Sequence, residues 1–262
     1  MLQQDPGGGI AEGAGARLAV TPCWYTPPDS HMLMRVVRTL ARAGKRQQFE
    51  REMFEKAPNM QGVAGALGSW VLRDLDSREG GYVVELWESE RHAVDWECAA
   101  VHNRLLREPL PGEFECHTCE IRSAWVAPDG LVANSEGDRG RSEGRHPPLY
   151  VRLTEGRVHP GMWADFQNAY KVHVETRAAP GLRMRWLVRS KSDAEAFFTV
   201  SIWDTLCHME SFERSDAVRR QILKHIARHL CGISSAHHCE VHRSLPLNVA
   251  ELATMIRPSR NA

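Results

Sequence analysis

"MRWLVRS" at residues 184–190 and "FTVSIWDTLCH" at 198–208 repeat, in altered form, two segments found earlier in the chain. The earlier segments read "GSWVLRD" at 68–74 and "YVVELWESERH" at 82–92. In both pairs the later tryptophan follows its earlier counterpart by 116 residues. A tryptophan, an arginine, a second tryptophan, an acid and a histidine therefore recur in one order, and a shared spacing of this kind indicates an internal repeat.

The match extends outward from the tryptophans at a nearly constant offset. The matched positions are Arg35/Arg152, Gly44/Gly161, Phe49/Phe166, Gly65/Gly181, Trp70/Trp186, Arg73/Arg189, Trp87/Trp203, Glu88/Asp204, His92/His208 and Cys119-Glu120/Cys239-Glu240. Chance does not place so many identities at one spacing, so we infer a duplicated domain.

Each copy has the same order of local patterns. A short extended run is followed by a glycine-led helical segment, then by two strand-like segments, a second helix and a last strand. In the second copy the first helix carries an apolar stripe of Trp163, Phe166, Tyr170, His173 and Val174. The order β-α-β-β-α-β is that of a ferredoxin-like unit, whose sheet has one bare face. We therefore predict an α+β protein in which two tandem ferredoxin-like repeats pack sheet to sheet, with helices outside.

Composition divides the chain into five segments. We predict a flexible N-terminal segment at 1–30, the first repeat at 31–126, a Gly-rich polar linker at 127–147, the second repeat at 148–244 and a C-terminal tail at 245–262.

The overall composition excludes several classes of function. The 262 residues carry 33 basic and 33 acidic side chains, so no net positive field attracts nucleic acid. The apolar runs are strand-sized, which predicts no membrane span. The N-terminus lacks the pattern of a signal peptide, so a cytoplasmic location is the default expectation. Seven irregularly spaced cysteines then indicate free thiols.

The repeated motifs resemble those of the antibiotic biosynthesis monooxygenase family. The resemblance rests on the first strand, the Gly-led helix, the "P/A-x-G" turn and the "ELWES" and "SIWDT" segments before the second helix. It covers roughly residues 32–125 and 148–244. It implies a dimeric α+β barrel, here supplied by one chain, and an oxygenase that needs no cofactor. It further implies a small-molecule aromatic or polyketide-like substrate and O2 as the partners.

The second copy carries more groups suited to such chemistry than the first. We predict His173 as general base, because a neutral imidazole accepts a phenolic proton near pH 7. Arg189 is the candidate that stabilises the substrate anion. Tyr170, near His173 on the same helix, is the third candidate catalytic residue. In the first copy Lys56 and Met53 occupy the places of His173 and Tyr170. The remaining predicted pocket residues are aromatic or imidazole side chains: Trp163, Phe166, Trp186, Trp203, His225 and His229.

Other interpretations remain open from the sequence. The paired tryptophans are typical of sheet–helix packing, and Arg73 and Arg189 of strand-surface charges. The i, i+4 spacing of His225 and His229 also suits a copper, zinc or heme ligand, so a heme-binding or heme-modifying protein is the second hypothesis. A non-catalytic accessory protein that binds a small molecule is the third. Further association of two chains into a homo-oligomer is left open.

Overall fold

Both halves of the chain fold in the predicted order of strands and helices. The computed structural model describes residues 23–25, 32–56, 60–77, 79–102, 112–127, 148–175 and 177–245. The first repeat consists of β2 (Leu33–Ala41), α1 (Arg46–Lys56), β3 (Ala66–Asp74), β4 (Gly80–Trp87), α2 (Glu90–His102) and β5 (Gly112–Val126).

The second repeat has the same order but a more irregular second helix. Its elements are β6 (Tyr150–Arg157), α3 (Trp163–Tyr170) with a π-helical turn (Lys171–Glu175), β7 (Leu182–Ser190), β8 (Ala196–Trp203), α4 (Leu206–Arg214), a second π-helical turn (Ala217–Ile222), α5 (Leu223–Ile226), a 3-10 turn (Ala227–His229) and β9 (Ser235–Leu245).

The last strand of each repeat crosses to the other repeat and closes the sheet into a barrel. β5 pairs with β2 along its first part and with β7 along its second, where Ala124 lies opposite Trp186. β9 in the same way pairs with β6 and then with β3, where Asp74 lies opposite Cys239. Eight antiparallel strands thus form a ring in the order β5-β2-β4-β3-β9-β6-β8-β7. The ring confirms the predicted tandem α+β barrel of two ferredoxin-like repeats.

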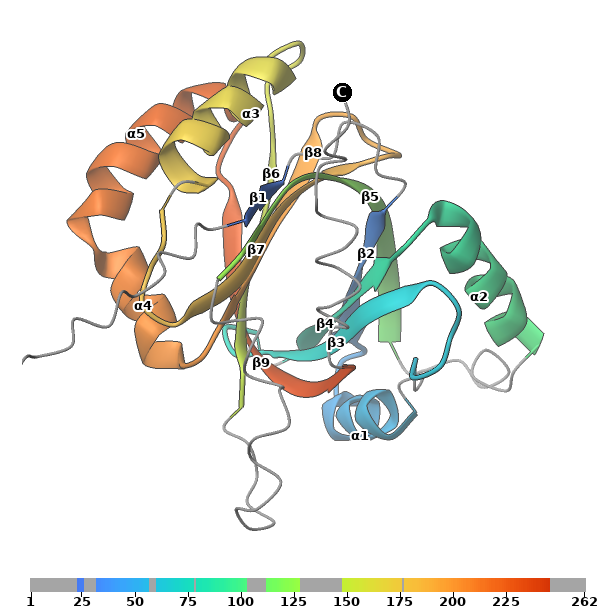
Figure 1. Ribbon diagram of the computed structural model, residues 1–262. Coiled ribbons are helices and arrows are strands. Elements are labelled where there is room, and N and C mark those ends of the chain that lie inside the picture. The colour runs from blue at the N-terminus through green and yellow to red at the C-terminus, as the bar shows by residue number, and fades with distance from the viewer. Residues whose placement is uncertain are drawn as a thin grey trace, which may run out of the picture.

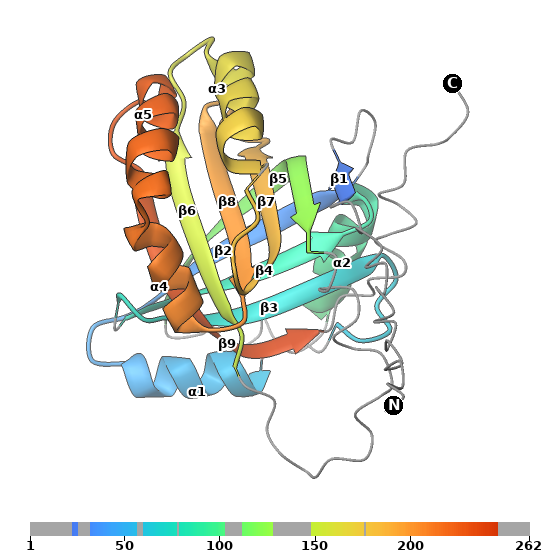
Figure 2. The same ribbon diagram turned by 60° about the vertical axis from the view of Figure 1, so that its left-hand side comes forward.

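The helices of each repeat cover the outer face of that repeat's own strands. Figures 1 and 2 show α1 and α2 beside the first repeat, and α3, α4 and α5 together over β6, β7 and β8 of the second. The inner faces of all eight strands are left to pack against one another.

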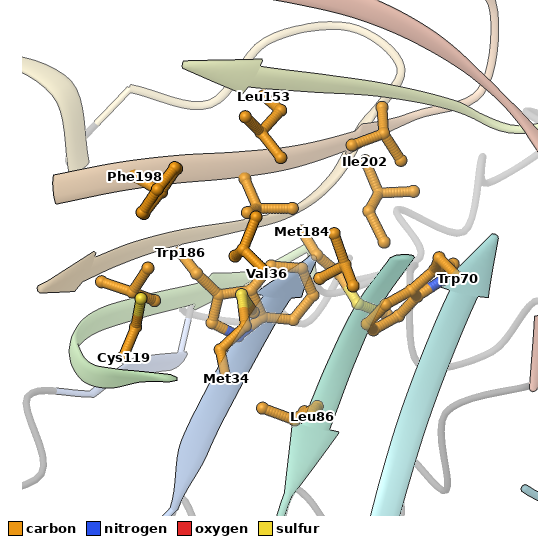
Figure 3. Close-up of a cluster of buried hydrophobic side chains, with 14 of the residues drawn as sticks. Met34, Val36, Trp70, Leu86, Cys119, Leu153, Met184, Trp186, Phe198 and Ile202 are labelled. Atoms are coloured by element: carbon orange, nitrogen blue, oxygen red, sulfur yellow. The ribbon is translucent and has the colours of Figure 1, made fainter. Parts of the chain in front are cut away.

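The barrel interior is one hydrophobic core built by both repeats (Figure 3). Because successive side chains of a strand point to opposite faces, Met184, Trp186 and Val188 of β7 all enter this core. The rings of Trp70 and Trp186 meet there across the repeats at 5.7 Å between centroids. This contact between the repeats explains why a tryptophan occurs at the same position in both.

The glycine and histidine of the repeated motif also meet in the structure. Gly65 and Gly181 have positive φ angles of 72° and 75°, which favour glycine. A Cβ at either position would lie 2.2 Å from the ring of His92 or His208 respectively. The motif is therefore explained by close packing at one corner of each repeat.

Parts of the predicted flexible segments fall outside the described residues. Cys23–Tyr25 forms β1, a short strand paired with β5, although it belongs to the segment 1–30 that the sequence predicts as flexible. The other residues of 1–30 lie outside the described residues. The same holds for the linker 127–147 beyond Ala127 and for the tail 245–262 beyond Leu245.

Replacing Trp186 with alanine tests whether the two repeats share one core. We expect the free energy of unfolding to fall by about 3–5 kcal/mol, because a fully buried indole is lost from a close-packed interior. Urea unfolding followed by fluorescence and by far-ultraviolet circular dichroism should give a single shifted transition. Leu75→Ala, at an exposed position, should change the free energy by less than about 0.5 kcal/mol. Two transitions, only one of them shifted, would contradict a shared core.

Candidate active site

A cavity of about 340 Å³ lies between the outer face of the second repeat's sheet and its helices. Its floor comes from β6, β7 and β8, and its roof from α3, α4 and α5 with the turns between them. The apolar lining includes three aromatic rings, and the polar lining consists of side chains of the floor, one tyrosine, one glutamate and Ser234 before β9. The principal lining residues are Phe166, Phe197, Phe212, Val174, Val218, Ile222, Ile226, Arg152, Thr154, Tyr170, Arg185, Thr199, Ser201 and Glu213.

One row of side chains crosses the floor at a single register. Ser201 on β8 lies opposite Arg152 on one side and Arg185 on the other, and Arg152 in turn lies opposite His238 of β9. The side chains of these four residues project from the outer face of the sheet, on four neighbouring strands. Three of the four are basic or imidazole side chains.

The first repeat has a different row at the same register. Thr118, Arg35, Glu85 and Ser69 stand where the second repeat has His238, Arg152, Ser201 and Arg185. There the buried Glu85 pairs with Arg35 at 3.7 Å and accepts a hydrogen bond from Trp87 Nε1 at 3.1 Å. The second repeat replaces this acid with Ser201, which accepts from the indole Trp203 Nε1 at 3.0 Å. Compared with the same row of the first repeat, the floor of the cavity thus lacks the buried acid and carries one additional arginine.

Arg185 is a buried cation whose hydrogen bonds are incomplete. Its Nη1 donates to the carbonyl oxygen of Val174 at 2.6 Å, but Nη2 is buried without a hydrogen-bond partner. Burial is the main cause that lowers the pKa of Arg185; the nearby charge of Arg152 acts the same way, whereas Tyr170 and Glu175 oppose it. Since guanidinium keeps its proton even so, the cavity holds a poorly solvated positive charge.

Tyr170 supplies a second unpartnered polar group to the same cavity. Its hydroxyl oxygen is buried and has no hydrogen-bond partner. Burial raises the pKa of Tyr170 to about 12, although Arg185 acts in the opposite direction. The phenol is therefore neutral near pH 7 and available as a donor. A buried hydroxyl and a buried guanidinium without partners cost free energy, and an oxyanion between them would satisfy both.

Arg152 and Glu213 form the other polar part of the wall. Arg152 Nε donates to Glu213 Oε1, and Arg152 also contacts Thr154 Oγ1. Burial alone would raise the pKa of Glu213, but Arg152 and His238 outweigh it and lower that pKa. Glu213 therefore stays ionised and is a weak base.

The cavity opens beside two exposed apolar side chains. Leu223 is 53% exposed and Ile233 fully exposed, and both also line the cavity. Gly232, which precedes Ile233 and also lines the cavity, has a φ of 91° that favours glycine. Exposed apolar side chains therefore form part of the cavity lining.

Of the site residues that the sequence suggested, Tyr170 and Phe166 line this cavity. Trp203 lies behind it, fully buried, with its ring 5.2 Å from that of Phe212. Trp186 lies on the other side of the sheet, inside the barrel, because it alternates with Arg185 along β7. The sequence-based pocket thus drew together residues from both faces of the sheet, and Trp186 does not line the cavity.

Arg189 and Trp163 lie beyond the cavity, near the end of β7. The guanidinium of Arg189 covers the Trp163 ring at 4.5 Å, and its Nε donates to the carbonyl oxygen of Ala194 at 2.7 Å. This geometry is that of a strand-surface arginine packed on an indole. Arg185, four residues earlier, is the arginine that enters the cavity.

The three predicted histidines gather at a separate, open groove between α3 and α5. The rings of His173 and His225 stack at 4.0 Å, and His173 and His229 line the groove together with Asp165. His173 does not face the sheet because the chain widens to π-helical form after Tyr170. With more residues in each turn, Val174 continues the buried stripe and His173 is left half-buried on the outer side.

The ring nitrogens of His229 are not free to bind a heme iron in this arrangement. His229 is buried, its Nε2 accepts from Arg228 Nε at 3.1 Å, and its Nδ1 is buried as well. The ring of His225 stacks on that of His173. Among the described residues, no group of three metal-binding side chains is placed to hold a metal ion.

The missed residue, Arg185, left a signal in the sequence. β7 reads as a strand whose alternate residues Met184, Trp186 and Val188 are apolar, so Arg185 falls on the face that also carries Leu187. A helix-covered face with an arginine at its centre is unusual for a strand that is otherwise buried. The equivalent residue of the first repeat, Ser69, carries no charge.

The sequence profile of the antibiotic biosynthesis monooxygenase family matches residues 32–105 and, a second time, residues 149–222. Together the two matches cover more than half of the chain. The chain belongs to the antibiotic biosynthesis monooxygenase family. Proteins of this family typically act on small molecules and oligomerise, and membership supports a general monooxygenase-like function.

Solved structures of similar fold agree with this family assignment. A candidate monooxygenase from Fusobacterium nucleatum aligns over 82% of this chain and 94% of its own, with a TM-score of 0.62 and 11% identity. An anthrone oxidase-like protein aligns over 85% and 95%, with a TM-score of 0.58 and 16% identity. A candidate monooxygenase from Lactobacillus acidophilus aligns over 83% and 100%, with a TM-score of 0.57 and 11% identity. At these identities the likeness concerns the fold.

Two further comparisons are negative. No curated protein matches the sequence. Within the described residues, no helix is long and apolar enough to cross a membrane.

Replacing Tyr170 with phenylalanine tests whether its hydroxyl lacks a partner. We expect the free energy of unfolding to rise by about 1–2 kcal/mol, because an unsatisfied buried hydroxyl is removed without changing the ring. Ser201→Ala is the matched opposite, since it leaves the buried Trp203 indole N–H without its acceptor and should lower the free energy by a similar amount. Urea titration of both variants measures the difference. A loss of stability in Tyr170→Phe would show that the hydroxyl already has a partner in the protein.

Proposed function

We propose that the second repeat of this monooxygenase-family protein oxidises a flat phenolic or anthrone-like molecule with O2, and that Arg185 and Tyr170 bind the oxygen of the substrate anion. The observation that carries the proposal is the pair of buried, unpartnered donors in one cavity of about 340 Å³. Donors held in place before the substrate arrives stabilise developing negative charge most effectively, because they need no reorganisation.

The chemistry requires no cofactor in this proposal. An anthrone that loses a C–H proton becomes an electron-rich enolate, which gives one electron to O2. The resulting radical and superoxide combine to a peroxide, and loss of water leaves a carbonyl. One oxygen atom of O2 enters the product, the other leaves as water, and both protons of the original CH2 group end in that water.

Arg185 and Tyr170 act at the first step, where the charge forms. A guanidinium beside the forming oxyanion lowers the pKa of the substrate, so that ionisation near pH 7 needs only a weak base or water at the opening. Glu213 lines the wall, but Arg152 and His238 hold its pKa low. His173 lines the separate groove, so the proposal assigns stabilisation of the anion, rather than a strong general base, as the main contribution of the site.

The apolar lining supports the later steps. Phe166, Phe197 and Phe212 offer ring faces to a planar substrate, and the first two pack together at 4.8 Å. An enclosed apolar space also keeps water from the peroxide and strengthens each charge interaction within it. The same fold in an anthrone oxidase-like protein is consistent with substrates of this shape.

Oxygen consumption with 1,8-dihydroxyanthrone as substrate tests the proposal. Arg185→Met should lower kcat by about 100-fold or more, as loss of an oxyanion donor typically does, and Tyr170→Phe should lower it by about 10-fold or more. Arg183→Met is the matched control, since Arg183 is another arginine of β7 but pairs with Asp204 and does not line the cavity. Its kcat should equal that of the wild-type protein.

Two further variants decide between this assignment and the one that the sequence suggested. If Arg189→Met or His173→Ala loses turnover while Arg185→Met keeps it, the chemistry takes place outside the cavity and the proposal is wrong. If the anthrone binds, no variant consumes O2 and the ligand is recovered unchanged, the protein is a binder and the oxidation step is withdrawn.

A further inference from the structure

A line of four charged side chains connects the cavity of the second repeat to a turn of the first. Arg152 on the cavity wall contacts Glu213 Oε1, and Glu213 Oε2 lies 2.8 Å from His238 Nε2. His238 Nδ1 lies 2.8 Å from Asp76 Oδ2, in the turn between β3 and β4. The same Asp76 oxygen accepts a hydrogen bond from the backbone N–H of His238 at 2.8 Å. Residues 162 positions apart in the chain thus meet at the strand exchange between β9 and β3.

The geometry requires His238 to carry a proton on both ring nitrogens. Each nitrogen faces a carboxylate oxygen at hydrogen-bond distance, and a carboxylate can only accept, so both nitrogens must donate. Burial alone would lower the pKa of His238, but the hydrogen bonds and charges of Glu213 and Asp76 outweigh it and raise that pKa. His238 is therefore an imidazolium held between two acids.

The other charged or titratable groups near His238 have other partners. Arg152 faces it from β6 as its register partner and is bound to Glu213. Glu240, the next outward residue of β9, pairs with Arg73 of β3 at 3.7 Å. His237 points to the opposite face of the strand, where it contacts Asp74 at 3.2 Å. Asp76 and Glu213 are thus the groups that control the charge of His238.

The line of charges exists at only one of two equivalent places. The backbone contact at the strand exchange is duplicated, since Leu75 N–H donates to the His238 carbonyl at 2.8 Å and Lys191 N–H donates to the Thr118 carbonyl at 2.9 Å. The side chains differ, because the counterparts of His238 and Asp76 are Thr118 and Ser192, which carry no charge. The charged line therefore occurs only on the side of the cavity that contains Arg185.

We propose that the β3–β4 turn of the first repeat positions the cavity wall of the second, through Asp76, a protonated His238 and Glu213 to Arg152. His238 and Asp76 are positioning residues, since neither lines the cavity. When His238 loses its proton, one ring nitrogen becomes an acceptor that faces a carboxylate. Because the backbone N–H of His238 still holds Asp76, Glu213 is the group that moves away. Arg152 then loses a fixed partner and becomes a free cation beside Arg185. The wall is ordered below the midpoint of His238 titration and is released above it.

The first experiment follows the link without any substrate. In the intact protein, nuclear magnetic resonance should show the His238 ring titrating above the usual value of about 6.5, with the Arg152 Nε–Hε signal changing at the same midpoint. Asp76→Asn keeps the hydrogen-bond acceptor but removes the charge, so both midpoints should fall together by about one pH unit. Asp95→Asn, an equal charge change on the exposed part of α2, should move neither. An Arg152 signal that ignores the His238 titration, or a His238 midpoint at or below 6.5, would overturn the proposal.

The second experiment measures the consequence for turnover, and this arm rests on the proposed function. The alkaline limb of kcat/KM for 1,8-dihydroxyanthrone should move to lower pH in Asp76→Asn by the same interval as the His238 midpoint. Thr118→Val, at the uncharged counterpart of His238, should leave the limb in place. Turnover with an unmoved limb would overturn the positioning role and leave the oxidation intact. A linked titration without turnover in any variant would overturn the oxidation and leave the link intact.

Discussion

Two strand pairings, β5 with β7 and β9 with β3, close the barrel and bring both repeats onto one interior. The sheet of a single repeat has a bare apolar face, and strand exchange covers each bare face with the other. Trp70 and Trp186 are therefore buried by the association of the two halves. Because this interior supplies the common hydrophobic core, the outer faces need not be apolar throughout, and the second repeat has room for charges beneath its helices.

Covalent fusion allows the two outer faces to differ. In a dimer of identical chains every substitution appears twice, so a group that suits one face is imposed on the other. Here the same register carries a buried acid–base pair, Glu85 with Arg35, in one repeat, and two arginines with a serine in the other. The first arrangement is internally neutral and has no need of a ligand. The second leaves Arg185 Nη2 without a hydrogen-bond partner, and the proposed binding site rests on that difference.

The sequence was sufficient for the fold but only partly for the site. The repeat, the order of elements and the closed barrel follow from the spacing of tryptophans and glycines, because that spacing reflects contacts made twice. Predicting the site required knowing from which face of its strand or helix each side chain projects. Two local features made that direction difficult to predict. Trp186 alternates with Arg185, so an error of one position exchanges barrel interior for cavity. The π-helical turn after Tyr170 moves His173 away from the buried apolar face of the helix. Such a turn cannot be predicted from the hydropathy pattern. The contact of His238 with Asp76 depends on strand exchange and is visible only in three dimensions.

The tryptophan pair inside the barrel affects the circular dichroism spectrum of the protein. Two indoles whose centroids lie 5.7 Å apart, with their planes inclined by 50°, couple their electronic transitions and give a pair of circular dichroism bands of opposite sign. Neither repeat alone contains both chromophores. The part of this signal that comes from Trp70 and Trp186, as distinct from that of Trp87 and Trp96 within the first repeat, is an intrinsic optical signature of barrel closure. It distinguishes a docked pair of repeats from two folded but separated ones without any attached label.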